Sequence, residues 1–163
     1  MVARAAWGVL AGVVLAGAAW AGMDRPLAMP AGGDYVSECG GCHTAYAPVL
    51  LPARSWRAVM AGLERHFGSD ASLEPALRDG LESELVALAL DAPGADPFVA
   101  SRRMAATETP VRVTETPFFR FMHDEVPGHI WRRPSVASKA NCVACHPRAD
   151  QGRYFEREIK IPK

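Results

Sequence analysis

Two copies of the pattern Cys-x-x-Cys-His constrain this chain more than any other feature of its sequence. The cysteines and histidines of the two motifs are Cys39, Cys42, His43, Cys142, Cys145 and His146. Two residues between the cysteines let one helical turn present both sulfurs to the vinyl groups of a porphyrin, while the next imidazole faces the iron. The pattern is the attachment sequence of c-type haem, so we expect two covalently bound haem c groups.

Three other uses of paired cysteines fit the sequence less well. A zinc ribbon places its two Cys-x-x-Cys pairs about 15 to 20 residues apart, whereas these pairs are separated by most of the chain. A thioredoxin-like redox pair occurs once, at the start of a helix within a βαβ unit. Two structural disulfides would suit an exported protein but would leave both adjacent histidines as coincidences.

The first residues of the 163-residue chain have the form of an export signal. Arg4 precedes an apolar run over residues 5–19, and Ala19-Trp20-Ala21 is typical of a cleavage site. We therefore predict a signal peptide over residues 1–21 and a periplasmic mature protein. The alternative is a retained membrane anchor, for which the run is short, since a span needs about 20 apolar residues.

Charge divides the mature chain into two parts. Residues 22–100 hold five basic and eleven acidic residues, and residues 101–163 hold twelve basic and seven acidic residues. This split suggests two lobes, and we predict a mainly α fold with a haem domain over residues 22–94 and a small, loop-rich second haem domain over residues 95–163. The order of elements expected in the first domain, a haem-attachment helix, a loop and two further helices, resembles a class I cytochrome c. The formal net charge is zero, and the sequence gives no reason to expect nucleic acid.

The first iron needs a ligand opposite His43, and His66 is the leading candidate. We expect a helix from Ser55 as N-cap through Phe67, with Gly68 just beyond its end. The apolar residues that recur along it at three- and four-residue steps are Trp56, Val59, Met60, Leu63 and Phe67. His66 lies at the edge of this stripe, with Met60 as the alternative. Met104 is disfavoured because it follows the next helix, predicted around residues 77–92.

The second iron has two candidates for the ligand opposite His146. Thr116-Pro117 reads as N-cap and first helical residue of a short helix that leads through Phe119 to His123. Phe119 lies four residues before His123 and therefore on the same face. His129 follows Pro127-Gly128 in a predicted turn and is the alternative ligand. A five-coordinate iron is the remaining possibility.

Strings in both halves of the chain resemble the soluble dihaem cytochrome c family called DHC. In the first half they are Glu38–His43, Tyr46, Leu50–Trp56 and His66–Gly68. In the second half they are Thr116–Phe119 leading to His123, Arg133–Ser138 and Asn141–His146. The resemblance implies a class I cytochrome domain, a second domain peculiar to the family, and two histidine ligands on each iron. It also implies a small oxygen-binding monohaem cytochrome c, SHP, as electron acceptor and a membrane cytochrome b as donor.

Two histidines on each iron would leave no open coordination position, which predicts an electron-transfer carrier with low potentials and no small-molecule substrate. Tyr46, three residues after His43, is a candidate for an aromatic group between the haems, or for ordinary pocket packing. The basic second half predicts docking to an acidic partner. The alternatives are an electron-transfer subunit of a periplasmic reductase and, with one five-coordinate iron, a haem enzyme or gas sensor.

Overall fold

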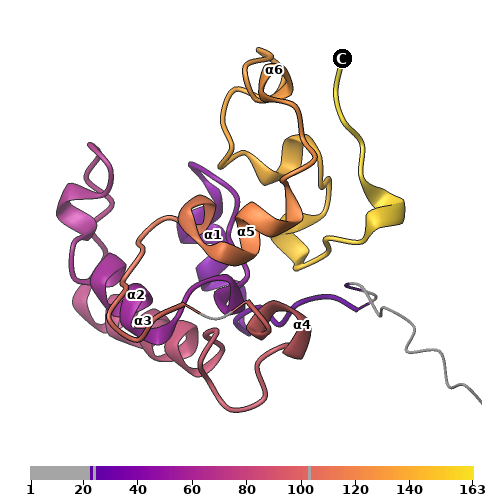
Figure 1. The fold of residues 1–163 in the computed structure, drawn as a ribbon. Coiled ribbons are helices and arrows are strands. Elements are labelled where there is room, and N and C mark those ends of the chain that lie inside the picture. The colour runs from indigo at the N-terminus through magenta and orange to yellow at the C-terminus, as the bar shows by residue number, and fades with distance from the viewer. Residues whose placement is uncertain (1–22, 24, 103) are drawn as a thin grey trace, which may run out of the picture.

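The computed structural model describes residue 23 and residues 25–102 and 104–163, and the predicted signal peptide lies outside these residues. Short helices joined by loops make up the described part (Figure 1). The α-helices are α1 (Asp34–Gly40), α2 (Ala53–Met60), α3 (Pro75–Ala87), α4 (Pro97–Ala100), α5 (Pro117–Met122) and α6 (Gly128–Trp131). The 3-10 turns are Pro48–Leu50, Leu63–Arg65, Val113–Glu115, Cys142–Ala144, Ala149–Gln151 and Glu156–Glu158.

The mainly α prediction is confirmed. Over the described ranges, extended pairing is limited to two isolated bridges, His66 with Ser69 and Arg148 with Arg153. A search of the same ranges finds no helix whose length and apolar character would suit a bilayer crossing.

Helix α2 differs at both ends from the helix predicted over residues 55–67. It begins at Ala53, so the prediction of Ser55 as N-cap is wrong, and Ser55 is fully buried inside the helix. Asp91, in the turn that follows α3, accepts the Ala53 N–H at 2.7 Å through its carboxylate. A distant side chain thus satisfies one of the first free backbone donors, which is why local sequence did not reveal the start.

Beyond Met60 the chain leaves the α-helix and makes a separate 3-10 turn over Leu63–Arg65. The buried positions Trp56, Met60 and Leu63 are confirmed as core residues. Phe67 is 49% exposed and has a φ of 51°, so it does not extend the buried stripe. The chain turns sharply here because both Phe67 and Gly68 adopt positive φ.

Helix α3 packs against α2 and buries Leu81 and Leu85. Glu74 caps it, since its carboxylate accepts the N–H groups of Ala76 at 2.9 Å and Leu77 at 3.3 Å. The helix ends at Ala87, several residues before the end expected near residue 92.

The parts of the chain before and after residue 95 share one hydrophobic core. Val99 of α4 is fully buried, and α4 packs against the turn Pro48–Leu50. The same cluster of buried side chains extends from Leu27 near the start of the described chain to Tyr154 near its end. The boundary between residues 94 and 95 stays a prediction, and the contacts across it hold the two haem motifs in a common framework.

Helix α5 begins where the sequence predicts. The hydroxyl oxygen of Thr116 accepts the Phe119 N–H at 3.1 Å, and Pro117 occupies the first helical position. Near the end of the second domain the chain makes the turn Glu156–Glu158 before it extends from Ile159. Lys160 then donates its backbone N–H to the carbonyl of Cys145 at 2.9 Å, which ties the C-terminal segment to the second motif.

Candidate haem-binding sites

Helix α1 carries the first motif at its C-terminal end. Cys39 lies in the last turn, and the His43 N–H donates back to the Cys39 carbonyl at 3.5 Å, so the backbone curls around the motif. Burial, followed by the nearby charge of Glu38, raises the pKa of the Cys39 thiol to about 11. This environment favours a neutral sulfur such as a thioether and disfavours the thiolate that a zinc site requires.

His66 faces His43 across a gap. The two imidazole rings have centroids 5.9 Å apart and planes inclined by 24°. The Nδ1 atom of His43 lies 2.7 Å from the carbonyl of Thr44, so Nδ1–H donates there and Nε2 keeps its lone pair. Burial, and then the charges of His43 and Arg112, lower the pKa of His66, which favours the neutral imidazole that binds metals.

The second motif lies on the turn Cys142–Ala144. The His146 N–H donates to the Cys142 carbonyl at 2.7 Å, which closes a helical turn of the kind that the motif spacing predicts. Burial raises the pKa of Cys142 to about 11 and also raises the pKa of Cys145. Both sulfurs are therefore in surroundings that suit an uncharged form.

His123 faces His146, with ring centroids 6.2 Å apart and planes inclined by 83°. Its Nδ1–H donates to the Phe119 carbonyl at 2.8 Å, and its ring stacks on the Phe119 ring at 4.1 Å. Burial lowers the pKa of His123, and burial together with the charge of His123 lowers the pKa of His146 to about 4. The ring nitrogen Nδ1 of His146 is buried and has no hydrogen-bond partner in the described part of the chain.

Both gaps fit an iron atom. A bond from a metal to an imidazole nitrogen is about 2 Å long, and that nitrogen lies about 1 Å from the ring centroid, so two imidazoles on opposite faces of one metal have centroids roughly 6 Å apart. The separations of 5.9 Å and 6.2 Å agree with this value. The donors present in each gap thus suit a haem attached through the neighbouring cysteines.

The other candidate ligands lie elsewhere. His129 is on α6 and is exposed, while Met60 is buried in the hydrophobic core. Met104 lines a separate pocket beside Arg54 and Ala100.

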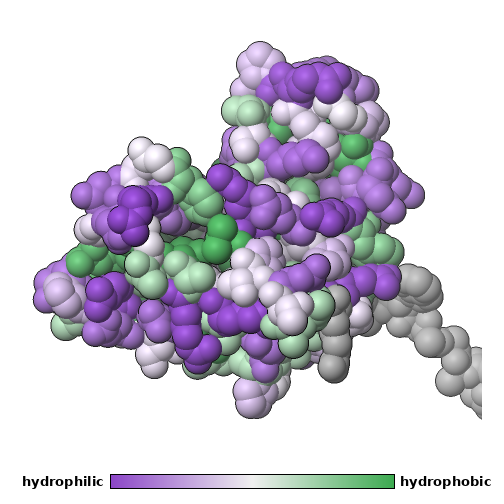
Figure 2. Space-filling view, turned by 60° about the vertical axis from the view of Figure 1, so that its left-hand side comes forward, coloured by the Kyte–Doolittle hydropathy of each residue, from purple (hydrophilic) through white to green (hydrophobic). Residues whose placement is uncertain are grey.

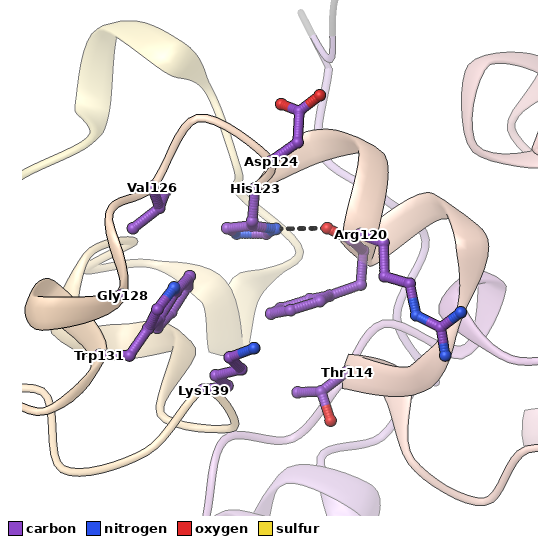
Figure 3. Close-up of a pocket in the computed structure, with 9 residues that line it drawn as sticks. Thr114, Arg120, His123, Asp124, Val126, Gly128, Trp131 and Lys139 are labelled. Carbon is purple, nitrogen blue, oxygen red and sulfur yellow. Dashed lines mark hydrogen bonds between the residues drawn. The ribbon is translucent and has the colours of Figure 1, made fainter.

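Residues that sequence reasoning missed lie beside the second pair of histidines, and Figure 3 shows those around His123. The Trp131 ring lies 5.7 Å from the His123 ring, and the Tyr154 ring lies 5.3 Å from the His146 ring. Lys139 faces the pocket that His123 and Trp131 line, which has a volume of about 410 Å³. No local pattern marks these residues, because they reach the site through the fold.

Around the first pair, Arg112 stacks on the exposed Phe67 ring at 4.0 Å, and Phe67 contacts the edge of His66 at 4.7 Å. Figure 2 turns the side of α2 and α3 toward the viewer and shows hydrophobic side chains gathered around a hollow on that face. Arg112 comes from the basic half of the chain, so each half contributes to the surroundings of the first motif.

Two such motifs on a helical scaffold, with donors spaced for iron, define a c-type cytochrome that carries two haems. The chain matches the dihaem cytochrome c family, DHC, over residues 35–154 and belongs to it. It is therefore an electron-transfer cytochrome with two covalently bound haem c groups.

Solved structures agree with this assignment. The chain is 45% identical to a diheme cytochrome c from Rhodobacter sphaeroides, with a TM-score of 0.69 over 76% of this chain and 97% of that one. A structure of DHC purified from Rhodobacter sphaeroides is 41% identical, with a TM-score of 0.64 over 78% of this chain and 100% of that one. A diheme cytochrome c from Shewanella baltica OS155 is 37% identical, with a TM-score of 0.65 over 82% and 95%. No curated protein matches the chain.

Proposed function

We propose that this cytochrome is a periplasmic electron carrier in which two histidines ligate each iron. His43 and His66 bind the first iron, and His146 and His123 bind the second. The observation that carries the proposal is the pair of facing imidazoles at each motif, with centroids 5.9 Å and 6.2 Å apart.

The haem supplies one-electron redox chemistry, and the residues of the chain determine what else can happen there. With His43 and His66 holding the first haem and His146 and His123 the second, neither group would offer an open position to a gas or a substrate, so no turnover of a small molecule is expected. The carbonyl oxygens that accept from Nδ1 of His43 and of His123 hold these rings in the tautomer that presents Nε2 to the metal.

Low reduction potentials follow from this ligand set. A second imidazole is a stronger donor than the thioether of methionine, so it stabilises Fe(III) relative to Fe(II). A low-potential carrier suits electron delivery to an oxygen-binding protein, and the family resemblance supports a small oxygen-binding monohaem cytochrome c as acceptor and a membrane cytochrome b as donor. The predicted signal peptide supports the periplasmic location.

The different ring orientations at the two irons give the proposal a direct spectroscopic test. Nearly parallel imidazole planes, as at His43 and His66, give different energies to the two iron d orbitals that overlap with the rings. Nearly perpendicular planes, as at His123 and His146, leave these two orbitals close in energy. Electron paramagnetic resonance of the oxidised protein should therefore show one ordinary rhombic low-spin signal and one low-spin signal of much larger g anisotropy.

Three matched substitutions assign the signals. His66→Met should remove the rhombic signal and His123→Met the strongly anisotropic one, each with a rise in potential at that haem alone. His129→Met is the control and should change neither signal, because His129 is exposed on α6. Loss of the second signal in His129→Met, or stoichiometric binding of carbon monoxide by the reduced wild-type protein, would contradict the ligand assignment.

A further inference from the structure

Lys139 brings a positive charge to the pocket beside His123. The pocket has a volume of about 410 Å³, and Figure 3 shows the Lys139 chain extending into the space that His123 and Trp131 border. Arg120 and Asp124 also line the pocket, but their charged groups point away from that space. The charge directed into the pocket therefore comes from Lys139.

Trp131 holds this charge close to the distal ligand. The Lys139 ammonium lies 5.7 Å from the centroid of the Trp131 ring, inside the limit of about 6 Å for attraction between a cation and an aromatic face. The same ring lies 5.7 Å from the His123 ring. Burial is the main cause of the lowered pKa of His123, and the charge of Lys139 adds to it. The ligand that faces His146 thus already experiences this ammonium group.

The charge of Lys139 is not neutralised by a protein carboxylate in the described part of the chain, whose ion pairs do not include this lysine. Arg112, the cation beside the first pair of histidines, differs in this respect. Its guanidinium pairs with Glu115 at 3.7 Å while it stacks on Phe67. The cation of the first site is therefore partly offset, and that of the second site is available to another anion.

A cation near a haem iron acts unequally on its two oxidation states. Fe(III) carries one more positive charge than Fe(II), so a nearby cation repels it more strongly and raises the reduction potential. Aromatic walls strengthen this effect, because a low dielectric screens charges less than water does. Haem also carries propionate carboxylates, and an ammonium group without a protein partner in its pocket is suited to pair with one of them.

We propose that Lys139 sets the reduction potential of the second haem, by pairing with a carboxylate of that haem and favouring its Fe(II) state. The step that it influences is the gain of one electron by Fe(III), in which no bond is made or broken. Lys139 itself is neither oxidised nor reduced. The proposal rests on the proposed carrier function, in which the electron comes from a redox partner and His123 ligates the second iron.

The test compares three variants of the complete dihaem protein. Lys139→Met removes the charge and keeps an unbranched side chain, whereas Lys139→Arg keeps the charge and alters the packing. Lys163→Met is the matched control, because it removes the same charge from the same half of the chain, and Lys163 does not line the pocket. The potential of the second haem is read in a redox titration, from the loss of the strongly anisotropic paramagnetic resonance signal on reduction.

We expect Lys139→Met to lower the ratio of Fe(II) to Fe(III) at the second haem by about three- to tenfold at a fixed potential, a shift of roughly 30–60 mV. The first haem should keep its potential in this variant. Lys139→Arg and Lys163→Met should stay close to wild type at both haems. A merely structural role would not give this pattern, because Lys139→Arg disturbs the packing without removing the charge.

An unchanged potential in Lys139→Met would overturn the proposal, as would equal shifts in Lys139→Met and Lys139→Arg or in Lys139→Met and Lys163→Met. Carbon monoxide addition to the reduced wild-type protein tests the carrier function separately. A vacant iron there would contradict the carrier function, while a normal wild-type spectrum with no shift in Lys139→Met would contradict the role of Lys139 alone.

Discussion

The contact between Leu27 and Gly152 joins the beginning of the described chain to its end, and replacing Gly152 by alanine should break it. The Leu27 N–H donates to the Gly152 carbonyl at 2.8 Å, and Leu27 is 3% exposed. Gly152 has a φ of 69°, and a Cβ atom placed on it would lie 2.2 Å from the Leu27 carbonyl oxygen. The backbone of Leu27 would have to move away.

Three costs contribute to the expected loss of stability. Alanine in the left-handed region costs about 1–2 kcal/mol. Loss of the backbone hydrogen bond costs about 1 kcal/mol. Displacement of Leu27 exposes part of a side chain whose full burial is worth about 1.5–3 kcal/mol. Their sum is roughly 4 kcal/mol, a large share of the total stability of a small protein.

Denaturant unfolding of the intact dihaem protein, followed by circular dichroism, measures this loss. Gly94→Ala is the matched control, because Gly94 has a φ of 82° and nothing within 4 Å of the added Cβ. It should show only the backbone cost of about 1–2 kcal/mol. Equal destabilisation by the two substitutions would refute the reasoning, since the contact with Leu27 would then contribute nothing.

Further predictions concern a helix cap, an ion-pair cluster and docking. Thr116→Ala should destabilise the protein by about 1 kcal/mol in denaturant unfolding through loss of the α5 cap, while Thr116→Ser should not. Glu158 pairs with Arg148 and Arg153, and its hydrogen bond to Arg153 chiefly lowers its pKa. The Glu158→Gln variant should therefore have a lower free energy of unfolding than wild type at neutral pH. The difference should shrink as the pH falls below 4.5, the ordinary glutamate pKa, because the Glu158 carboxylate of the wild-type protein then becomes protonated. Stopped-flow association with an acidic redox partner should slow as salt rises, because residues 101–163 hold twelve basic and seven acidic residues; a rate independent of salt would contradict the docking prediction.

Helices α2 and α5 show why some local structure could be predicted and some could not. The start of α5 is encoded by adjacent residues, because Thr116 caps the N–H of Phe119 and Pro117 follows it directly. The start of α2 depends on Asp91, which is 38 residues away from Ala53 in sequence. The helix ends at Met60 and a separate 3-10 turn follows over Leu63–Arg65, whereas the apolar stripe through Phe67 predicts a continuing helix.

The sequence by itself determined the chemistry of this cytochrome, because two Cys-x-x-Cys-His motifs specify haem attachment through contacts within five residues. Only the tertiary structure decided which histidines face the motifs: His66 lies opposite His43 and His123 lies opposite His146, while His129 is exposed. Such pairings depend on packing between segments many residues apart, so the local helix patterns favoured His66 and His123 but left Met60 and His129 as alternatives.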